Sequence, residues 1–187
     1  MLGLCRNVFK SGLKLKKSKW EKEGGFQLSG KTVGIIGCAH IGSDVIKLLA
    51  PIECNLLVRD IVDKSNFCRD QGVSESSLEE VIERSDLISL HVPYMVDENF
   101  LLKIKPTDFL VNTCRGEVVD QNALKKALEK QTIAGAALDV FIGEPPTDSE
   151  FLSLPNLMVT PHIGGNAKEA VEAMGLSAIN HAHFLFQ

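Results

Sequence analysis

Residues Val33 to Gly42 read VGIIGCAHIG, and this stretch decides the fold. A short apolar run ends in a glycine turn, and residues 41–50 continue with the apolar spacing of a helix. The turn fits the dinucleotide-binding pattern G-x-G-x-x-G at Gly37, Ala39 and Gly42, with alanine in place of the middle glycine. In such a turn the backbone approaches a pyrophosphate, which lies on the free N–H groups of the following helix. The stretch therefore predicts a dinucleotide site.

A carboxylate at the expected distance supports this prediction. Asp60 closes the next apolar run, where it can accept hydrogen bonds from ribose hydroxyls and repel a 2′-phosphate. Asp60 thus favours NAD over NADP, although the adjacent Arg59 leaves NADP open. A nucleoside-triphosphate loop, the alternative, requires a lysine followed by serine or threonine after its second glycine. Ser43 and Asp44 stand there instead, so that alternative is excluded.

Composition and charge limit the kind of protein. The 187 residues, 44% hydrophobic and 24% charged, are enough for one globular domain with a sizeable core. The net charge is −4, but residues 1–20 contain six basic residues and no acid, so the remainder carries −10. This balance excludes a nucleic-acid surface on the main body. The basic start is interpreted as a solvated segment, with a mitochondrial presequence as the alternative.

Neither a membrane span nor a metal site is predicted. The sequence has no run of 18 apolar residues. Its five cysteines are widely spaced and form no C-x-x-C pair, which is not the spacing of a zinc site or a disulfide framework. We therefore expect a reducing, cytoplasmic setting.

Predicted strands and helices alternate along the chain. Apolar runs predict strands at residues 31–37, 55–60, 87–92, 108–113, 133–140 and 157–160, and helical spacing or caps predict helices at 41–50, 77–85, 120–130 and 167–186. Short, nearly continuous apolar strands between helices predict a doubly wound parallel α/β sheet covered on both faces. In such sheets ligands bind outside the carboxyl ends of the strands.

Three polar stretches follow predicted strands at that edge. They are NTCRG (residues 112–116), DVFIGEPP (139–146) and TPHIGG (160–165). They offer a cation at Arg115, a carboxylate at Glu144 and an imidazole at His162. Reduction of a 2-keto acid uses these types: the cation holds the substrate carboxylate, the imidazole donates a proton, and the carboxylate orients the imidazole. Each residue alone also fits a surface role, but all three at one edge favour a site.

The chain resembles the D-isomer-specific 2-hydroxyacid dehydrogenases, which include phosphoglycerate dehydrogenase. From Trp20 to Phe186 the stretches LSGKTVGIIG, SDLISLHVP, VNTCRGEVVD, AGAALDVFIGEPP and LPNLMVTPHIGG follow the pattern of the cofactor-binding domain of that family in order. The resemblance implies a Rossmann-type NAD-binding domain. It also implies an oxidoreductase that transfers hydride between NAD and a small D-2-hydroxy acid or 2-keto acid, and it implies a homodimer.

The resemblance also assigns residues. Arg115 would bind the substrate carboxylate, Glu144 would be the partner acid, and His162 would be the proton donor and acceptor. The residues implied at the cofactor are Gly37, Ala39, His40, Ile41, Gly42, Asp60, His91, Val92, Pro93, Thr113, Cys114, Arg115, Asp139, His162 and Gly164. Asp139 would face the nicotinamide amide.

The sequence departs from the family in its domain organisation as well as at Ala39. Family members begin with a substrate-side lobe that is largely absent here, and Met1 falls inside the helix that would link the lobes. We expect a basic interdomain helix and linker at 1–28, the NAD-binding domain at 29–165, and a helix at 166–187 returning toward the missing lobe. The segment 94–104 is shorter than in the family. Alternatives to an enzyme are a non-catalytic NAD-binding association module and a truncated inactive remnant.

Overall fold

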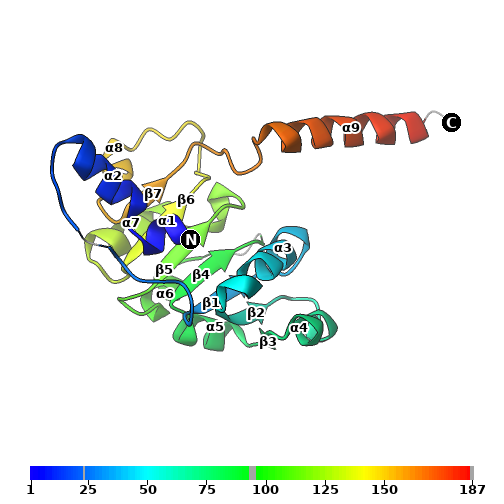
Figure 1. Ribbon diagram of the computed structural model, residues 1–187, viewed down its shortest axis with the longest axis horizontal. Helices are drawn as coiled ribbons and strands as arrows, with labels where there is room; N and C mark the ends of the chain where they lie inside the picture. Colours follow the sequence, from blue (N-terminus) through cyan, green and yellow to red (C-terminus); the bar gives the residue numbers. More distant parts are fainter. Residues whose placement is uncertain (23, 93–95, 186–187) are drawn as a thin grey trace.

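The computed structural model describes residues 1–22, 24–92 and 96–185. Its centre is a seven-stranded sheet in the order β3-β2-β1-β4-β5-β6-β7 (Figure 1). The strands are β1 (Thr32–Ile36), β2 (Asn55–Arg59), β3 (Ser74–Glu75), β4 (Leu87–Leu90), β5 (Phe109–Asn112), β6 (Gly135–Leu138) and β7 (Leu157–Val159). Each pairing between these neighbours is parallel. The predicted doubly wound sheet is confirmed, and the strand order reverses between β1 and β4, where such sheets bind ligands.

Helices connect the strands. They are α1 (Leu2–Cys5), α2 (Val8–Lys16), α3 (His40–Leu49), α4 (Ser65–Gln71), α5 (Leu78–Arg84), α6 (Glu98–Lys103), α7 (Gln121–Glu129), α8 (Ser149–Leu152) and α9 (Lys168–Leu185), with the 3₁₀ turns η1 (Ala50–Ile52) and η2 (Gly116–Val118). The capping box predicted before α5 is present, since Ser77 and Glu80 each bond the other's backbone N–H. Asp120 caps α7, also as predicted.

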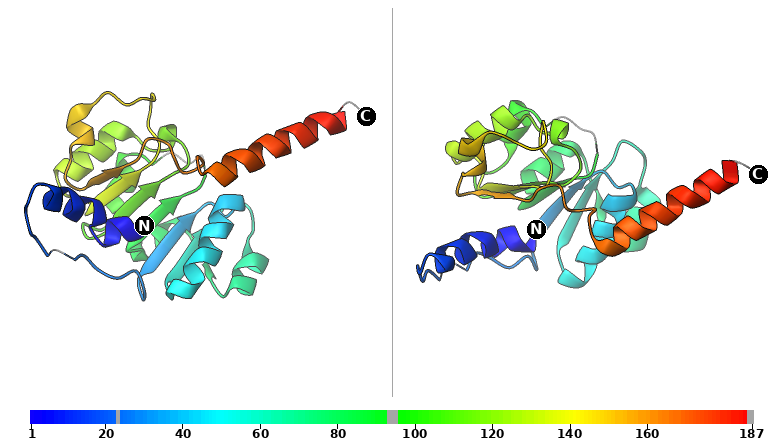
Figure 2. Two further views of the ribbon diagram at one scale, coloured as in Figure 1. Left: turned by 45° about the horizontal axis from the view of Figure 1, so that its top comes forward. Right: turned by 90° about the horizontal axis from the view of Figure 1, so that it is seen from above.

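Helices lie on both faces of the sheet (Figure 2). Two layers of buried apolar side chains hold them there. Ile36 of β1 belongs to the layer with residues of α5, α6 and α7. The neighbouring Ile35 belongs to the other layer, with residues of α1, α3 and α4. Successive strand residues therefore point to opposite faces, and both faces are buried. Leu4 and Cys5 place α1 in the core rather than on a free linker.

The last helix, α9, leaves the body after β7 and points away from it (Figures 1 and 2). Its described side chains include exposed apolar groups at Val171, Met174, Leu176 and Ile179. Among the helices of the described residues, none is both long and apolar enough to span a membrane.

Candidate functional site

The glycine turn joins β1 to α3 and lies against the end of β4. Gly37 has φ of 98°, and a Cβ there would lie 2.3 Å from Cγ1 of Val92. A Cβ on Gly42 would lie 1.9 Å from the carbonyl oxygen of Gly37. Both positions therefore require glycine, because a side chain would collide with its neighbours. The turn brings the backbone of residues 37–42 to the surface at the carboxyl edge of the sheet.

Ala39 does not strain this turn. Its φ of −84° and ψ of −156° are extended values that any L-residue adopts, and it is exposed. It is the N-cap of α3, and its methyl group cannot accept a hydrogen bond. The N–H groups of the first helical turn, which includes His40, Ile41 and Gly42, are therefore left for solvent or for an anion.

We expect Ala39→Gly to tighten the binding of NAD about fivefold, equivalent to about 1 kcal/mol, because the methyl group stands where backbone meets phosphate. Calorimetric titration of both proteins with NAD measures the change. Ala50→Gly, just beyond the far end of α3, is the matched control and should leave the affinity unchanged. An unchanged affinity in Ala39→Gly would show that the methyl group does not contact the phosphates.

Asp60, at the end of β2, is bonded to the glycine turn. Its Oδ2 accepts a hydrogen bond from the N–H of Cys38 at 2.6 Å, and its Oδ1 accepts one from Val62 at 3.0 Å. Burial, the largest single cause, acts to raise the pKa of the Asp60 carboxyl. The hydrogen bonds from the Val62, Cys38 and Ile61 amides, together with the charge of Lys64, outweigh burial and leave the pKa below its ordinary value. A negative charge is therefore fixed beside the turn, where a ribose would lie.

The residues that follow β4 pack against the glycine turn. Nε2 of His91 lies 3.0 Å from the Ser89 hydroxyl, whereas Nδ1 is buried and has no partner among the described residues. Burial lowers the pKa of His91 to about 4, so this imidazole is neutral at physiological pH. Val92 contacts the turn at Gly37. Pro93, which was also assigned to the cofactor, lies outside the described residues.

Arg115 follows β5 and is exposed at the same edge. Its guanidinium donates to the carbonyl of Cys114 at 2.6 Å. Thr113 beside it is exposed, and Cys114 is half-buried with its thiol 3.0 Å from Oδ1 of Asn112. Burial raises the pKa of the Cys114 thiol, so this cysteine stays protonated and is suited to packing rather than to nucleophilic chemistry.

Glu144 and His162 form a pair across the loops that follow β6 and β7. Nδ1 of His162 lies 2.8 Å from Oε2 of Glu144, and Oε1 of Glu144 accepts from the N–H of Phe141 at 3.1 Å. The hydrogen bond from His162, and then that from Phe141, lowers the pKa of Glu144. Because an ionised carboxylate only accepts, the proton of the neutral ring lies on Nδ1. Nε2 then remains available for a ligand.

Asp139, at the end of β6, shapes the loop that carries His162. Its buried carboxylate accepts hydrogen bonds from the Thr160 hydroxyl and from the N–H groups of Ile163 and Gly164, the last two at 2.9 and 2.8 Å. Burial, the largest single cause, acts to raise the pKa of Asp139, but these hydrogen bonds together with nearby His162 leave the pKa below its ordinary value. The main-chain oxygen of Asp139 also accepts from the His162 N–H at 2.8 Å. The structure thus brings Asp139, His162 and Gly164 together.

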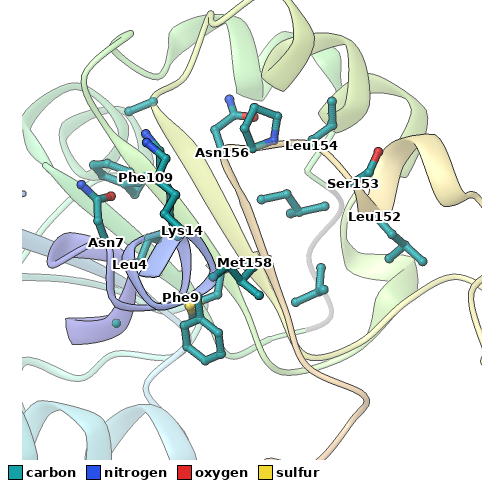
Figure 3. A pocket seen from close by; sticks show the side chains of 17 residues that line it. Leu4, Asn7, Phe9, Lys14, Phe109, Leu152, Ser153, Leu154, Asn156 and Met158 are labelled. Atoms are coloured by element: carbon teal, nitrogen blue, oxygen red, sulfur yellow. The ribbon is translucent and has the colours of Figure 1, made fainter. Parts of the chain in front are cut away.

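A separate groove of about 550 Å³ lies between α2 and the segment around β7 (Figure 3). Leu4, Phe9, Leu13, Leu154 and Met158 are among its apolar lining residues, and it shares no residue with the candidate site. Within residues 1–22, 24–92 and 96–185, no cluster of three or more side chains suited to hold a metal ion occurs.

Comparison with known proteins identifies the family. The sequence profile described as "D-isomer specific 2-hydroxyacid dehydrogenase, NAD binding domain" matches residues 1–164. The chain belongs to the D-isomer specific 2-hydroxyacid dehydrogenase family. Within this family it is 39% identical over 189 aligned residues to a glyoxylate reductase of Pyrococcus furiosus, covering 93% of this chain and 56% of that enzyme.

Solved structures of the family have the same fold. A glyoxylate reductase from Paecilomyes thermophila superposes with a TM-score of 0.90 at 29% identity, covering 98% of this chain and 58% of that chain. A D-lactate dehydrogenase from Aquifex aeolicus, complexed with NAD and lactic acid, gives a TM-score of 0.89 at 27% identity, covering 99% and 63%. The chain therefore spans little more than half the length of these dehydrogenases.

Some residues of this NAD-binding domain that organise the edge were not found from the sequence. Asn112 bonds the turn that carries Arg115, and the Thr160 hydroxyl bonds Asp139. The amides of Cys38 and Phe141 hold the carboxylates of Asp60 and Glu144. Of these residues, only Asn112 and Thr160 could be recognised from the sequence, as polar residues inside the NTCRG and TPHIGG stretches. Backbone donors cannot be recognised in this way, because every non-proline residue has an N–H.

Proposed function

We propose that this chain is the NAD-binding domain of a dehydrogenase that transfers hydride between NAD and a small D-2-hydroxy acid or 2-keto acid. The single observation that carries the proposal is the 2.8 Å pair of Glu144 and His162 at the same sheet edge as the glycine turn bonded to Asp60. A proton-transfer group and a dinucleotide cradle thus share one edge. Membership in the family supports the same conclusion.

The residues of the turn fit NAD. Gly37 and Gly42 let the turn pack closely against Val92 and against itself, and the free N–H groups at the start of α3 suit a pyrophosphate. Asp60 would hold the ribose, with His91, Val92, Thr113, Cys114 and Gly164 along the remaining edge. NAD bound there supplies the hydride acceptor of the reaction.

The chemistry at the substrate follows from three side chains. The Arg115 guanidinium is exposed and suited to hold a carboxylate through two parallel hydrogen bonds. Nε2 of His162 takes the hydroxyl proton during oxidation and returns it during reduction. Glu144 keeps the ring oriented through Nδ1 and stabilises the imidazolium that forms. In this proposal Asp139 fixes the loop of His162, and its buried carboxylate also borders the nicotinamide position.

The test is the preference between the two coenzymes. We expect NAD to bind at least roughly tenfold more tightly than NADP, because the 2′-phosphate would meet the Asp60 carboxylate. Calorimetric titration with each coenzyme measures the ratio. Asp60→Asn should reduce the ratio toward one, and Asp70→Asn on α4 is the control that should preserve it. Equal or tighter binding of NADP to the unaltered chain would refute this assignment.

We also propose that the protein forms a homodimer in the cytoplasm. The support for association is apolar surface near the start of the chain: Phe9 and Leu13 of α2 are exposed and border the groove of Figure 3, and Trp20 is exposed farther on. The support for a reducing compartment is that Cys5, Cys38, Cys54, Cys68 and Cys114, all described, are free thiols.

A further inference from the structure

The Asn112 carboxamide is buried beneath the turn that carries Arg115. Asn112 is the last residue of β5, lies between β4 and β6, and is 1% exposed. Its Nδ2 donates to the carbonyl oxygen of Arg115 at 2.8 Å. Its Oδ1 accepts from the N–H of Cys114 at 3.0 Å and from the Cys114 thiol at 3.0 Å. The Asn112 side chain is therefore hydrogen-bonded to the peptide group before Cys114 and to the peptide group after Arg115.

The turn that carries Arg115 packs closely against the loop that carries Glu144. A Cβ on Gly116 would lie 2.0 Å from the carbonyl carbon of Phe141 and 2.5 Å from the nitrogen of Ile142. Phe141 in turn donates its N–H to Glu144, which pairs with His162. The backbone position of Arg115 is thus fixed on one side by Asn112 and on the other by the peptide that leads to the Glu144 and His162 pair.

We propose that Asn112 is a positioning residue for Arg115. The hydrogen bonds of its carboxamide fix the turn from which the Arg115 side chain extends, and they thereby set the position of the guanidinium relative to His162. The inference rests on the proposed function, because it gives Arg115 a substrate carboxylate to bind. Because Asn112 is 1% exposed, we assign it a positioning role rather than contact with substrate or coenzyme. Its effect reaches the reaction through the carbonyl of Arg115 and the N–H of Cys114.

Asn112→Asp removes the amide donor of this arrangement and places a carboxyl group at a buried position. The aspartate keeps an acceptor for the Cys114 N–H but presents an oxygen, instead of an N–H, to the carbonyl of Arg115. Asn112→Ala removes both the donor and the acceptor. Asn55→Asp is the matched control, because Asn55 also donates through Nδ2 to a main-chain oxygen, that of Gly30, at the start of β2 on the opposite edge of the sheet.

The experiment uses the full 187-residue chain and two titrations. The first measures NADH binding by fluorescence, and the second measures binding of oxamate, an unreactive 2-keto acid analogue, to the NADH complex. We expect both Asn112 variants to bind NADH within about twofold of the unaltered chain. Their NADH complexes should bind oxamate roughly 10- to 100-fold more weakly, because a displacement of about 1 Å in a positioning group has effects of that order. Asn55→Asp should match the unaltered chain in both titrations.

Two outcomes overturn the inference. One is oxamate affinity in Asn112→Ala within twofold of the unaltered chain. The other is an equal loss of NADH and oxamate affinity, which would mean that Asn112 acts on the folding of the whole edge. Failure of the unaltered NADH complex to bind oxamate would instead count against the proposed function. In that case amide hydrogen exchange decides the role of Asn112: faster exchange confined to residues 113–116 in Asn112→Ala supports positioning, and unchanged or edge-wide exchange refutes it.

Discussion

In a chain that carries a complete substrate-side lobe, replacing His162 by alanine is expected to lower turnover of a 2-keto acid by about 100- to 10,000-fold while leaving NADH affinity within a few-fold, because loss of a general acid–base group has effects of that size. Nδ1 of His162 is held by Glu144 at 2.8 Å, so only Nε2 can exchange a proton with substrate. Oxidation of NADH by glyoxylate, pyruvate and hydroxypyruvate, followed optically, measures turnover. A fluorescence titration measures NADH binding separately.

Two further variants test whether the loss of turnover is due to removal of the His162 imidazole. His162 has φ of 52°, a left-handed value that asparagine adopts more readily than alanine. His162→Asn should therefore show the same loss without additional backbone strain. His181→Ala on α9 removes an exposed imidazole whose Nδ1 lies 3.0 Å from the Ser177 carbonyl oxygen, and it should leave turnover unchanged. Near-normal turnover in either His162 variant would refute its role as the proton donor and acceptor.

In the same lobe-containing chain, replacing Arg115 by lysine is expected to reduce kcat/KM for 2-keto acids on the order of 100-fold, the effect of losing one well-placed charged donor in an active site. Lysine keeps the positive charge, but it cannot offer the planar pair of N–H donors that matches a carboxylate. Steady-state kinetics at varied keto-acid concentration measure kcat and KM separately. NADH affinity should stay within about twofold, because the substitution removes no backbone donor from the glycine turn.

Arg84→Lys is the matched control for this substitution. Arg84 is exposed near the end of α5, at the amino edge of the sheet, and lies 3.8 Å from Glu80. Its replacement should change neither kcat/KM nor NADH affinity. If Arg115→Lys retained near-normal kcat/KM, the substrate carboxylate would have to be bound by another group.

The sequence was sufficient for the main sheet because each of its longer strands carries a local signal. Residues 33–36 and 87–90 are uninterrupted apolar runs or nearly so, and both are buried on two faces in the structure. The start of α5 was predicted for the same kind of reason, since Ser77 and Glu80 are three residues apart and need no distant partner. Helix α4 has the largely polar sequence SNFCRDQ, and β3 has two residues, so neither shows a periodic pattern.

The candidate site was predictable only as a set of residue types at one edge. Arg115, Glu144 and His162 could be placed there because each follows a strand of a parallel sheet. Their fixation could not be predicted, because it depends on contacts between segments distant in sequence. These contacts form only once the strands are paired. They include the hydrogen bond from the Cys38 N–H to Asp60 and the packing of Gly116 on Phe141. The sequence predicts Asn112 only as a strand residue, because no neighbouring residue indicates where its carboxamide points.

A small or cationic residue in place of Asp60 would change coenzyme preference and turn geometry together, because the Asp60 carboxylate accepts the hydrogen bond from the Cys38 N–H. Exchanging Asp60 for a small or cationic residue would remove the charge that opposes a 2′-phosphate. The same exchange would leave the N–H of the buried Cys38 without its acceptor, which costs about 1–3 kcal/mol for a buried donor. A redesigned NADP-binding form of this domain would therefore need a second change that restores an acceptor for the Cys38 N–H.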